Sequence, residues 1–305
     1  MKRFKEKSTG VINAADLKTI KGKFVFWLIF AFLALVCIMC LVPTFWTLMT
    51  GFKTSKEIYT SAKFFPSNLS FALIGENLRT AWKAMDAVRA SLNTLIICIA
   101  STLFTLVIDG LGGYVLSRLK PTGSKVMFAL IVWTMMMPSQ IRTVPLYISY
   151  ISFPFVGNFP FEVNLMNTYW PMILSGVANA FTVMLFKNNF DSVSISYVEA
   201  AKLDGCNNLR VFFNIMVPLS VPIIMYVAIG CMRAPWGDFF TPFLVLTDKE
   251  RQTLPVKIYL LSTSSSIKMN TYMLCLILSS IPGFLIFVLF QRYILGGINV
   301  GGVKG

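Results

Sequence analysis

The chain of 305 residues contains no histidine, and only 13 of its residues are Asp or Glu. Histidine is the commonest general base and metal ligand, so its absence removes the usual centre of a hydrolytic or metal site. Charged residues make up 13% of the chain, about half of the roughly 25% typical of soluble domains. No G-x-x-x-x-G-K-[ST] phosphate loop occurs either. We therefore expect a non-catalytic chain that binds no cofactor and no metal and does not hydrolyse ATP by itself.

Apolar residues are abundant instead. Hydrophobic side chains account for 56% of the sequence, and the mean hydropathy is +0.70. The net charge of +14 could suggest nucleic acid, but in a membrane protein excess Lys and Arg mark cytoplasmic loops and contact anionic lipid headgroups. Lipid is therefore the expected solvent, and no nucleic-acid partner is expected.

The apolar residues are grouped into runs long enough to cross a bilayer. A hydrocarbon core of about 30 Å needs about 20 apolar residues per helix. Six runs meet this length. They cover residues 24–48, 90–116, 126–149, 168–187, 215–241 and 271–294. The sequence thus predicts an all-α integral membrane protein with six transmembrane helices within residues 24–294.

Basic residues decide the predicted orientation. Residues 1–23 form a polar tail with seven Lys and Arg, and residues 295–305 form a short tail at the other end. Because dense Lys and Arg clusters stay in the cytoplasm, the N-terminal tail is expected there. Six spans then bring the C-terminal tail to the same side. The expected location is the cell membrane, with both termini cytoplasmic.

A polar loop at residues 188–216 separates the fourth and fifth runs. Ser196 and Glu199 fit a capping box, and Gly205 fits a left-handed C-terminal cap. Together they predict a short helix over 197–204 and a helix–turn–helix elbow hinged at the glycine. Local rules alone leave two readings open, a docking surface for a soluble partner and a plain capped loop.

The spacing in this loop resembles the Glu-Ala-Ala signature of binding-protein-dependent ABC importer permeases. The matching residues are Glu199, Ala200, Ala201, Gly205, Ile215 and Pro218, with Val217 where Leu is usual. Further stretches, including Met137-Pro138 and the Gly301-Gly302 tail, resemble the carbohydrate branch and its maltose-type second permease subunit. The resemblance implies the type I ABC importer permease fold.

The resemblance also implies an assembly. The chain would form half of a translocation pathway for sugars, oligosaccharides in particular, in the inner membrane of a bacterium. Its partners would be a second permease subunit, two ATPase subunits that hold ATP and Mg, and an extracytoplasmic sugar-binding protein. The coupling loop of this chain would comprise Glu199, Ala200, Ala201, Asp204 and Gly205. Glu199 would pair with a cation on the ATPase, and the two alanines would let the ATPase approach closely. Gly205 would supply the bend.

Polar residues near the predicted spans are further candidates. Arg233, Trp236 and Asp238 lie near the outer end of the fifth run and are possible pathway or outer-gate residues. Arg233 and Asp238 could pair with each other or line a polar path. Asp109 lies inside the second run, where a carboxylate is either functional or, as we favour, hydrated or paired with a neighbouring subunit near the cytoplasmic edge.

Two other functions remain as alternatives. An ion-coupled secondary transporter of small polar solutes would require an inverted repeat or titratable residues at the midplane, and neither is evident. A membrane-embedded enzyme would require a catalytic constellation, and the sequence offers no paired carboxylates or activated nucleophile.

Overall fold

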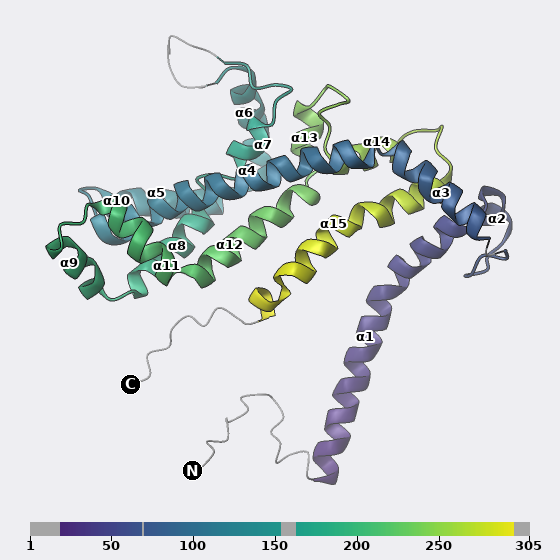
Figure 1. Ribbon diagram of the computed structural model, residues 1–305, viewed down its shortest axis with the longest axis horizontal. Helices are drawn as coiled ribbons and strands as arrows, with labels where there is room; N and C mark the ends of the chain where they lie inside the picture. Colours follow the sequence, from purple (N-terminus) through teal and green to yellow (C-terminus); the bar gives the residue numbers. More distant parts are fainter. Residues whose placement is uncertain (1–18, 69, 154–162, 296–305) are drawn as a thin grey trace. The chain divides into compact units, whose positions relative to one another are not determined.

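The computed structural model describes residues 19–68, 70–153 and 163–295 (Figure 1). Within these residues the regular structure is helical, and the single extended pairing is an antiparallel bridge between Phe153 and Val163. Most of both predicted tails lies outside the described residues. The chain forms two compact units, described separately here: Met1–Arg79 with Lys268–Ile277, and Thr80–Ile267 with Leu278–Gly305.

The first unit is built around a long apolar helix. It contains α1 (Ile20–Phe52), α2 (Ser55–Thr60), most of α3 (Phe71–Ala84) and the start of α15 (Met269–Leu295). Thr19 caps α1 by accepting a hydrogen bond from the backbone N–H of Gly22 at 3.0 Å. Near its other end, a Cβ at Gly51 would lie 2.6 Å from the Leu274 side chain, so glycine allows α1 and α15 to pack closely there.

The second unit holds the remaining elements. They are α4 (Ala87–Tyr114), η2 (Val115–Leu119), α5 (Ser124–Met136), α6 (Ser139–Ile151), α7 (Trp170–Ser175), α8 (Ala180–Ser192), α9 (Ile195–Leu203), α10 (Asn208–Val211), η3 (Phe212–Met216), α11 (Val217–Leu219), α12 (Val221–Arg233), η4 (Ala234–Trp236), α13 (Phe240–Val245) and α14 (Leu254–Ser262), with the rest of α15. η2 and η3 are π-helical turns. Such turns are rare in proteins overall, and those that occur are frequently found at functional sites.

The core of the second unit forms where α4 packs along α8 and α12, with α5 against α8 (Figure 1). The approach of α4 to α8 is close at one point. A Cβ at Gly113 would lie 2.6 Å from the Cβ of Phe186 and 2.9 Å from the backbone nitrogen of Lys187. Small residues of this kind let membrane helices pack backbone to backbone.

Three described helices are long and apolar enough to cross a membrane: Ile20–Phe52, Ala87–Leu119 and Met269–Gln291. A fourth candidate pairs Asn208–Leu219 with Val221–Trp236, which meet at an angle of 86°. The three long helices confirm the apolar runs predicted at 24–48, 90–116 and 271–294.

The prediction of six transmembrane helices is not confirmed in the described part of the chain, where three or four candidate spans occur. The run at 126–149 breaks before Pro138, whose ring disfavours helical geometry at the preceding residue. The run at 215–241 bends at Ser220, because Pro222 can donate no hydrogen bond to the turn before it. The run at 168–187 breaks over residues 176–179, where no proline occurs.

Candidate docking site at the α9–α10 elbow

Residues 194–211 form the predicted elbow, and its first helix starts earlier than predicted. Ser194 is the N-cap of α9 and accepts from the backbone N–H of Ser196 at 3.4 Å, while the two hydroxyl oxygens lie 2.7 Å apart. The capping box predicted from Ser196 and Glu199 is therefore wrong, because Ser196 already lies in the first helical turn. The carboxylate of Glu199 is exposed and forms no hydrogen bond or ion pair with a residue that the structure describes.

The bend of the elbow is a Schellman motif. Gly205 has a φ of +79°, the left-handed conformation that glycine adopts without a Cβ clash. Its N–H donates to the carbonyl of Lys202 at 3.0 Å, and the N–H of Cys206 donates to the carbonyl of Ala201 at 2.9 Å. Asn207 then caps α10 by accepting from the N–H of Arg210 at 2.8 Å. The expected bend at Gly205 is thus present.

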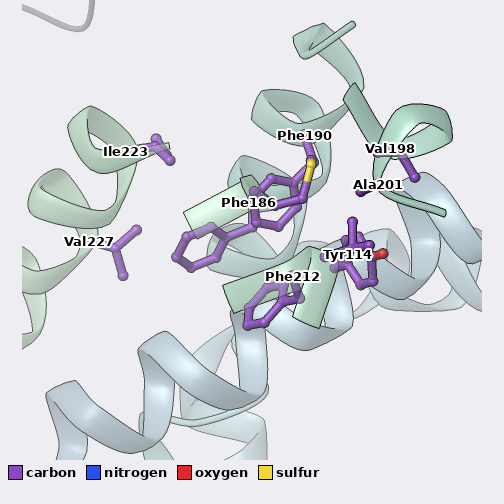
Figure 2. Close-up of a cluster of buried hydrophobic side chains, with 10 residues drawn as sticks. Tyr114, Phe186, Phe190, Val198, Ala201, Phe212, Ile223 and Val227 are labelled. Carbon is purple, nitrogen blue, oxygen red and sulfur yellow. The ribbon is translucent and has the colours of Figure 1, made fainter. Parts of the chain in front are cut away.

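The inner face of α9 is part of the core. Val198 and Ala201, one helical turn apart, are each only 6% exposed. They belong to one buried cluster with aromatic rings from α4, α8 and η3, whose side chains Figure 2 shows. The rings belong to Tyr114, Phe186, Phe190 and Phe212, with centroids 5.4–6.3 Å apart in the Tyr114–Phe212, Phe186–Phe190 and Tyr114–Phe190 pairs.

This packing gives the two alanines of the motif different surroundings. Ala201 points into the chain's own core, whereas Ala200 is exposed together with Glu199 and Asp204. Close seating against a partner can therefore involve Ala200 directly, while Ala201 allows α9 to lie close to the aromatic rings. The small side chain at Ala201 has an intramolecular reason that the sequence motif did not reveal.

The outer face of the elbow combines exposed apolar side chains with charges. Leu203 is 89% exposed at the tip of α9, and Ile195, Tyr197 and Leu209 are also exposed. Lys202 and Arg210 lie among them. Exposed apolar groups rimmed by charged residues are typical of a surface that another protein covers.

A polar bracket, the hydrogen-bonded group of Ser117, Arg118, Lys187 and Asp191, holds the end of α8 that leads into the elbow. Arg118 of η2 donates to the backbone carbonyls of Phe190 and Val193, which close the last turn of α8. Asp191 accepts from the Ser117 hydroxyl at 2.6 Å and from the Lys187 ammonium at 2.7 Å. Burial alone would raise the pKa of the Asp191 carboxyl, but these two hydrogen bonds outweigh it and hold the pKa below its usual range. No local sequence signal indicates this bracket, since Arg118 and Phe190 are 72 residues apart.

The last two residues of the motif lie where the elbow joins the following helices. Ile215 belongs to η3 and packs, half-buried, against the aromatic cluster. Pro218 is exposed at the start of α11, just before the 86° bend at Ser220. A movement of the elbow would therefore reach α12 through a bent segment.

The predicted pathway residues are not joined into one group. Arg233 is exposed, and it forms no ion pair with Asp238 in the described ranges. Asp238 instead accepts from the backbone N–H groups of Phe240 and Thr241 and so caps α13. Asp238 also lines a cavity of about 250 Å³, and Trp236 is half-buried nearby in η4. Of the two arrangements considered for Arg233 and Asp238, the pair is wrong.

The expected setting of Asp109 is also wrong. The side chain is fully buried, and its two carboxylate oxygens accept hydrogen bonds from the backbone N–H groups of Ala178 and Asn179. It is neither hydrated at an edge nor in need of a neighbouring subunit, because its partners belong to its own chain.

Comparisons with known proteins show the family and the fold of this chain. Residues 110–299 match the family described as "Binding-protein-dependent transport system inner membrane component". The probable ABC transporter permease protein YurM of Bacillus subtilis (strain 168) is 30% identical over 279 residues, which cover 91% of this chain and 88% of that protein. The diacetylchitobiose uptake system permease protein NgcG of Streptomyces coelicolor is 27% identical over 275 residues, covering 89% and 86%.

The chain is also similar to a further permease and to a solved structure. The arabinooligosaccharides transport system permease protein AraQ of Halalkalibacterium halodurans is 26% identical over 285 residues, covering 92% of this chain and 96% of that protein. Among solved structures, a chain of a bacterial ABC transporter involved in the import of the acidic polysaccharide alginate superimposes with a TM-score of 0.73 at 20% identity. The superposition covers 90% of this chain and 98% of that one, so the two share a fold.

Proposed function

This chain belongs to the binding-protein-dependent ABC importer permeases, and we propose that it imports sugars as one of two permease subunits in a bacterial cell membrane. The relatives named above include permeases for diacetylchitobiose and for arabinooligosaccharides, and another is the melibiose/raffinose/stachyose import permease protein MelC of Bacillus subtilis. These names favour oligosaccharides as the substrate class. The alternative of an ion-coupled secondary transporter has no support among the relatives.

We propose that the chain crosses the membrane six times, three times as a long helix and three times as a broken one. Neighbouring helices can satisfy the backbone groups freed at such breaks. Both termini and the elbow would lie on the cytoplasmic side, as the basic N-terminal tail favours. The alternation of sides along the chain then brings the loop between the fourth and fifth passes to the ATPase.

The proposed mechanism is alternating access driven through the elbow. ATP and Mg would be held by two separate ATPase subunits, and a binding protein on the other side would deliver the sugar. Closure of the ATPase dimer would move α9, with Glu199 facing a cation on the ATPase. The observation that carries this proposal is the two-sided character of α9, since its inner face is buried among Phe186, Phe190 and Phe212 while its outer face is exposed. A force on that outer face would therefore act on a helix that shares one buried cluster with residues of α4, α8 and η3.

The test is a crosslink at the tip of α9. Leu203→Cys, in a background with Cys206→Ser, places a thiol at a position of the helix where the native side chain is 89% exposed. We expect a short thiol-directed crosslinker to join this chain to an ATP-hydrolysing subunit in native membranes. Uptake of labelled oligosaccharide into vesicles should require ATP and a binding protein. Uptake driven by an ion gradient without ATP, or a crosslink that captures no nucleotide-hydrolysing protein, would contradict the proposal.

A further inference from the structure

The α7–α8 segment is interrupted in the middle of a predicted membrane span. α7 ends at Ser175, and α8 begins at Ala180. Within the break Ala178 has a φ of +56°, a left-handed conformation that few residues other than glycine adopt. Backbone groups freed by a break inside a bilayer find no water there, so they need partners within the protein.

α4 supplies these partners from one face. Asp109 accepts from the N–H of Ala178 at 2.7 Å with one oxygen, and from the N–H of Asn179 at 3.3 Å with the other. One helical turn earlier, the Thr105 hydroxyl donates to the carbonyl of Gly176 at 3.4 Å. Among the described residues Asp109 forms no ion pair. Its carboxylate is therefore committed to the backbone of the break.

The hydrogen-bond donors at the break favour a carboxylate over an amide at residue 109. Both groups that Asp109 faces are N–H donors, and a carboxylate presents acceptors on both of its oxygens. An amide at the same position would present one acceptor and one donor, and the donor would point at a backbone N–H. The side chain of Asn179 is then available to cap α8, where it accepts from the N–H groups of Phe181 and Thr182.

The break lines a cavity, and α8 connects it with the elbow. The cavity of about 250 Å³ is bordered by Thr105, Gly176 and Asn179 and also by Cys231 of α12. At the other end of α8, the rings of Phe186 and Phe190 lie in the cluster that holds α9 (Figure 2). One short helix therefore has the proposed docking site at one end and the wall of a cavity at the other.

We propose that Asp109 is a positioning residue that holds the α7–α8 break as a joint, so that movement of the elbow passes along α8 and changes the cavity. α8 can then move with the elbow while α7 stays in place. This inference rests on the proposed function, since it requires that the elbow be moved by a partner. It adds the place where that movement is converted into a change at the cavity.

The experiment follows the thiol of Cys231, which borders the cavity and is half-buried. In a background where Cys231 is the single cysteine of the chain, the assembled complex is labelled with a maleimide, with and without ATP and vanadate. We expect the labelling rate to differ between the two states. In Asp109→Asn the difference should disappear, and sugar uptake per ATP hydrolysed should fall about tenfold, the size expected when a charge-assisted hydrogen bond is lost. In the separate Cys206→Ser background used for the crosslink, Asp109→Asn should leave the Leu203→Cys crosslink intact.

Two variants address the possibility that Asp109→Asn fails to assemble. Thr105→Val removes the hydroxyl that reaches Gly176 but keeps the shape of the side chain, and it should reduce the labelling difference. Thr102→Val is the matched control, because that hydroxyl bonds within its own helix, to the carbonyl of Cys98 at 2.6 Å. Thr102→Val should leave both labelling and uptake unchanged.

A second-site change tests the backbone argument directly. Ala178→Gly places a residue that accepts a positive φ at the break, so the break depends less on the carboxylate. Combined with Asp109→Asn, it should restore part of the uptake and of the labelling difference.

The outcomes separate the joint from the proposed function. If the elbow crosslinks to the ATPase but Asp109→Asn and Thr105→Val keep the wild-type labelling difference, the joint is wrong and the function stands. The joint is also wrong if Thr102→Val matches Thr105→Val in its effect. If the elbow never crosslinks in the wild type, the proposed function itself fails.

Discussion

At the scale of single residues, Gly205 is a position where backbone conformation alone restricts the side chain. Its φ of +79° closes the Schellman motif, and a Cβ added there would meet nothing within 4 Å. A substitution therefore acts through backbone strain and not through a steric clash. A non-glycine residue in this conformation costs roughly 1–2 kcal/mol.

We expect Gly205→Val to leave membrane insertion intact and to uncouple ATP hydrolysis from uptake, because the strained bend shifts α9 on its partner. The ratio of sugar transported to ATP hydrolysed, measured in proteoliposomes, checks this. Gly283→Val is the matched control, since Gly283 also has open space around its Cα but lies in helical geometry within α15. Wild-type coupling in Gly205→Val would refute the expectation.

Glu199 provides a second test at this scale. Because its carboxylate is exposed and has no partner in the described part of the chain, its replacement should not alter the stability of the permease. Glu199→Lys should instead weaken ATPase binding by reversing the charge that faces the proposed cation. Co-purification of the ATPase at two salt concentrations measures the effect. Unchanged retention of the ATPase at low salt would exclude a role for this charge.

At the scale of elements, the bracket at the end of α8 links two helices that are distant in sequence. Arg118 donates to the carbonyls of Phe190 and Val193, and the carbonyl of Phe190 also accepts from the backbone N–H of Val193 at 3.2 Å. Arg118→Ala should lower the free energy of unfolding by about 1.5–3 kcal/mol, the range for hydrogen bonds to a charged group. Arg118→Lys should recover only part of this, because an ammonium lacks the planar fork of a guanidinium. Thermal unfolding of the purified chain compares the three proteins.

Asp191 in the same bracket gives the stability a pH dependence with a defined sign. Because its pKa is lowered in the folded chain, its contribution is present above the ordinary carboxyl pKa and is lost as the pH falls below about 4. Asp191→Asn should remove this component of the acid destabilisation. Melting temperatures of both proteins between pH 7 and pH 3 measure it, and parallel curves would show that Asp191 contributes nothing.

The bounds of the helices show which elements could be predicted from the sequence. Long apolar runs predicted the three long helices, because a continuous helix needs only local information. The break at residues 176–179 was not foreseen, because it contains no proline and its stabilising carboxylate, Asp109, lies 69 residues away from Ala178 in the sequence. The start of α9 was misplaced because Ser194 and Ser196 both satisfy the rule for an N-cap, and only the packing of Val198 and Ala201 selects between them.

At the scale of the whole molecule, the motif predicted the elbow but not how it is held. Glu199, Ala200 and Gly205 are exposed on the elbow, whereas Ala201 is buried in a cluster with rings from α4, α8 and η3. Those contacts join residues distant in sequence, so no local pattern could supply them. For the pathway candidates Arg233 and Asp238 the sequence leaves two arrangements open, a mutual pair or a polar path, and the pair is absent because Asp238 caps backbone N–H groups instead.

The six-pass arrangement makes a prediction for the entire chain. Reporter domains fused before Met1 and after Gly305 should both be active on the cytoplasmic side, since an even number of passes returns the chain to the side where it began. A reporter inserted at Lys249, in the segment before α14, should be active on the opposite side. Opposite locations for the two terminal reporters would mean an odd number of passes.

The shared core of α9, α4, α8 and η3 has a consequence for modularity. Residues 194–211 cannot be exchanged as an independent unit. The buried side of their first helix belongs to a cluster that also contains Tyr114, Phe186, Phe190 and Phe212. Transplanting that stretch alone into another transporter would leave Val198 and Ala201 without the rings that enclose them. A functional chimera should therefore need those four aromatic residues to be exchanged together with the elbow.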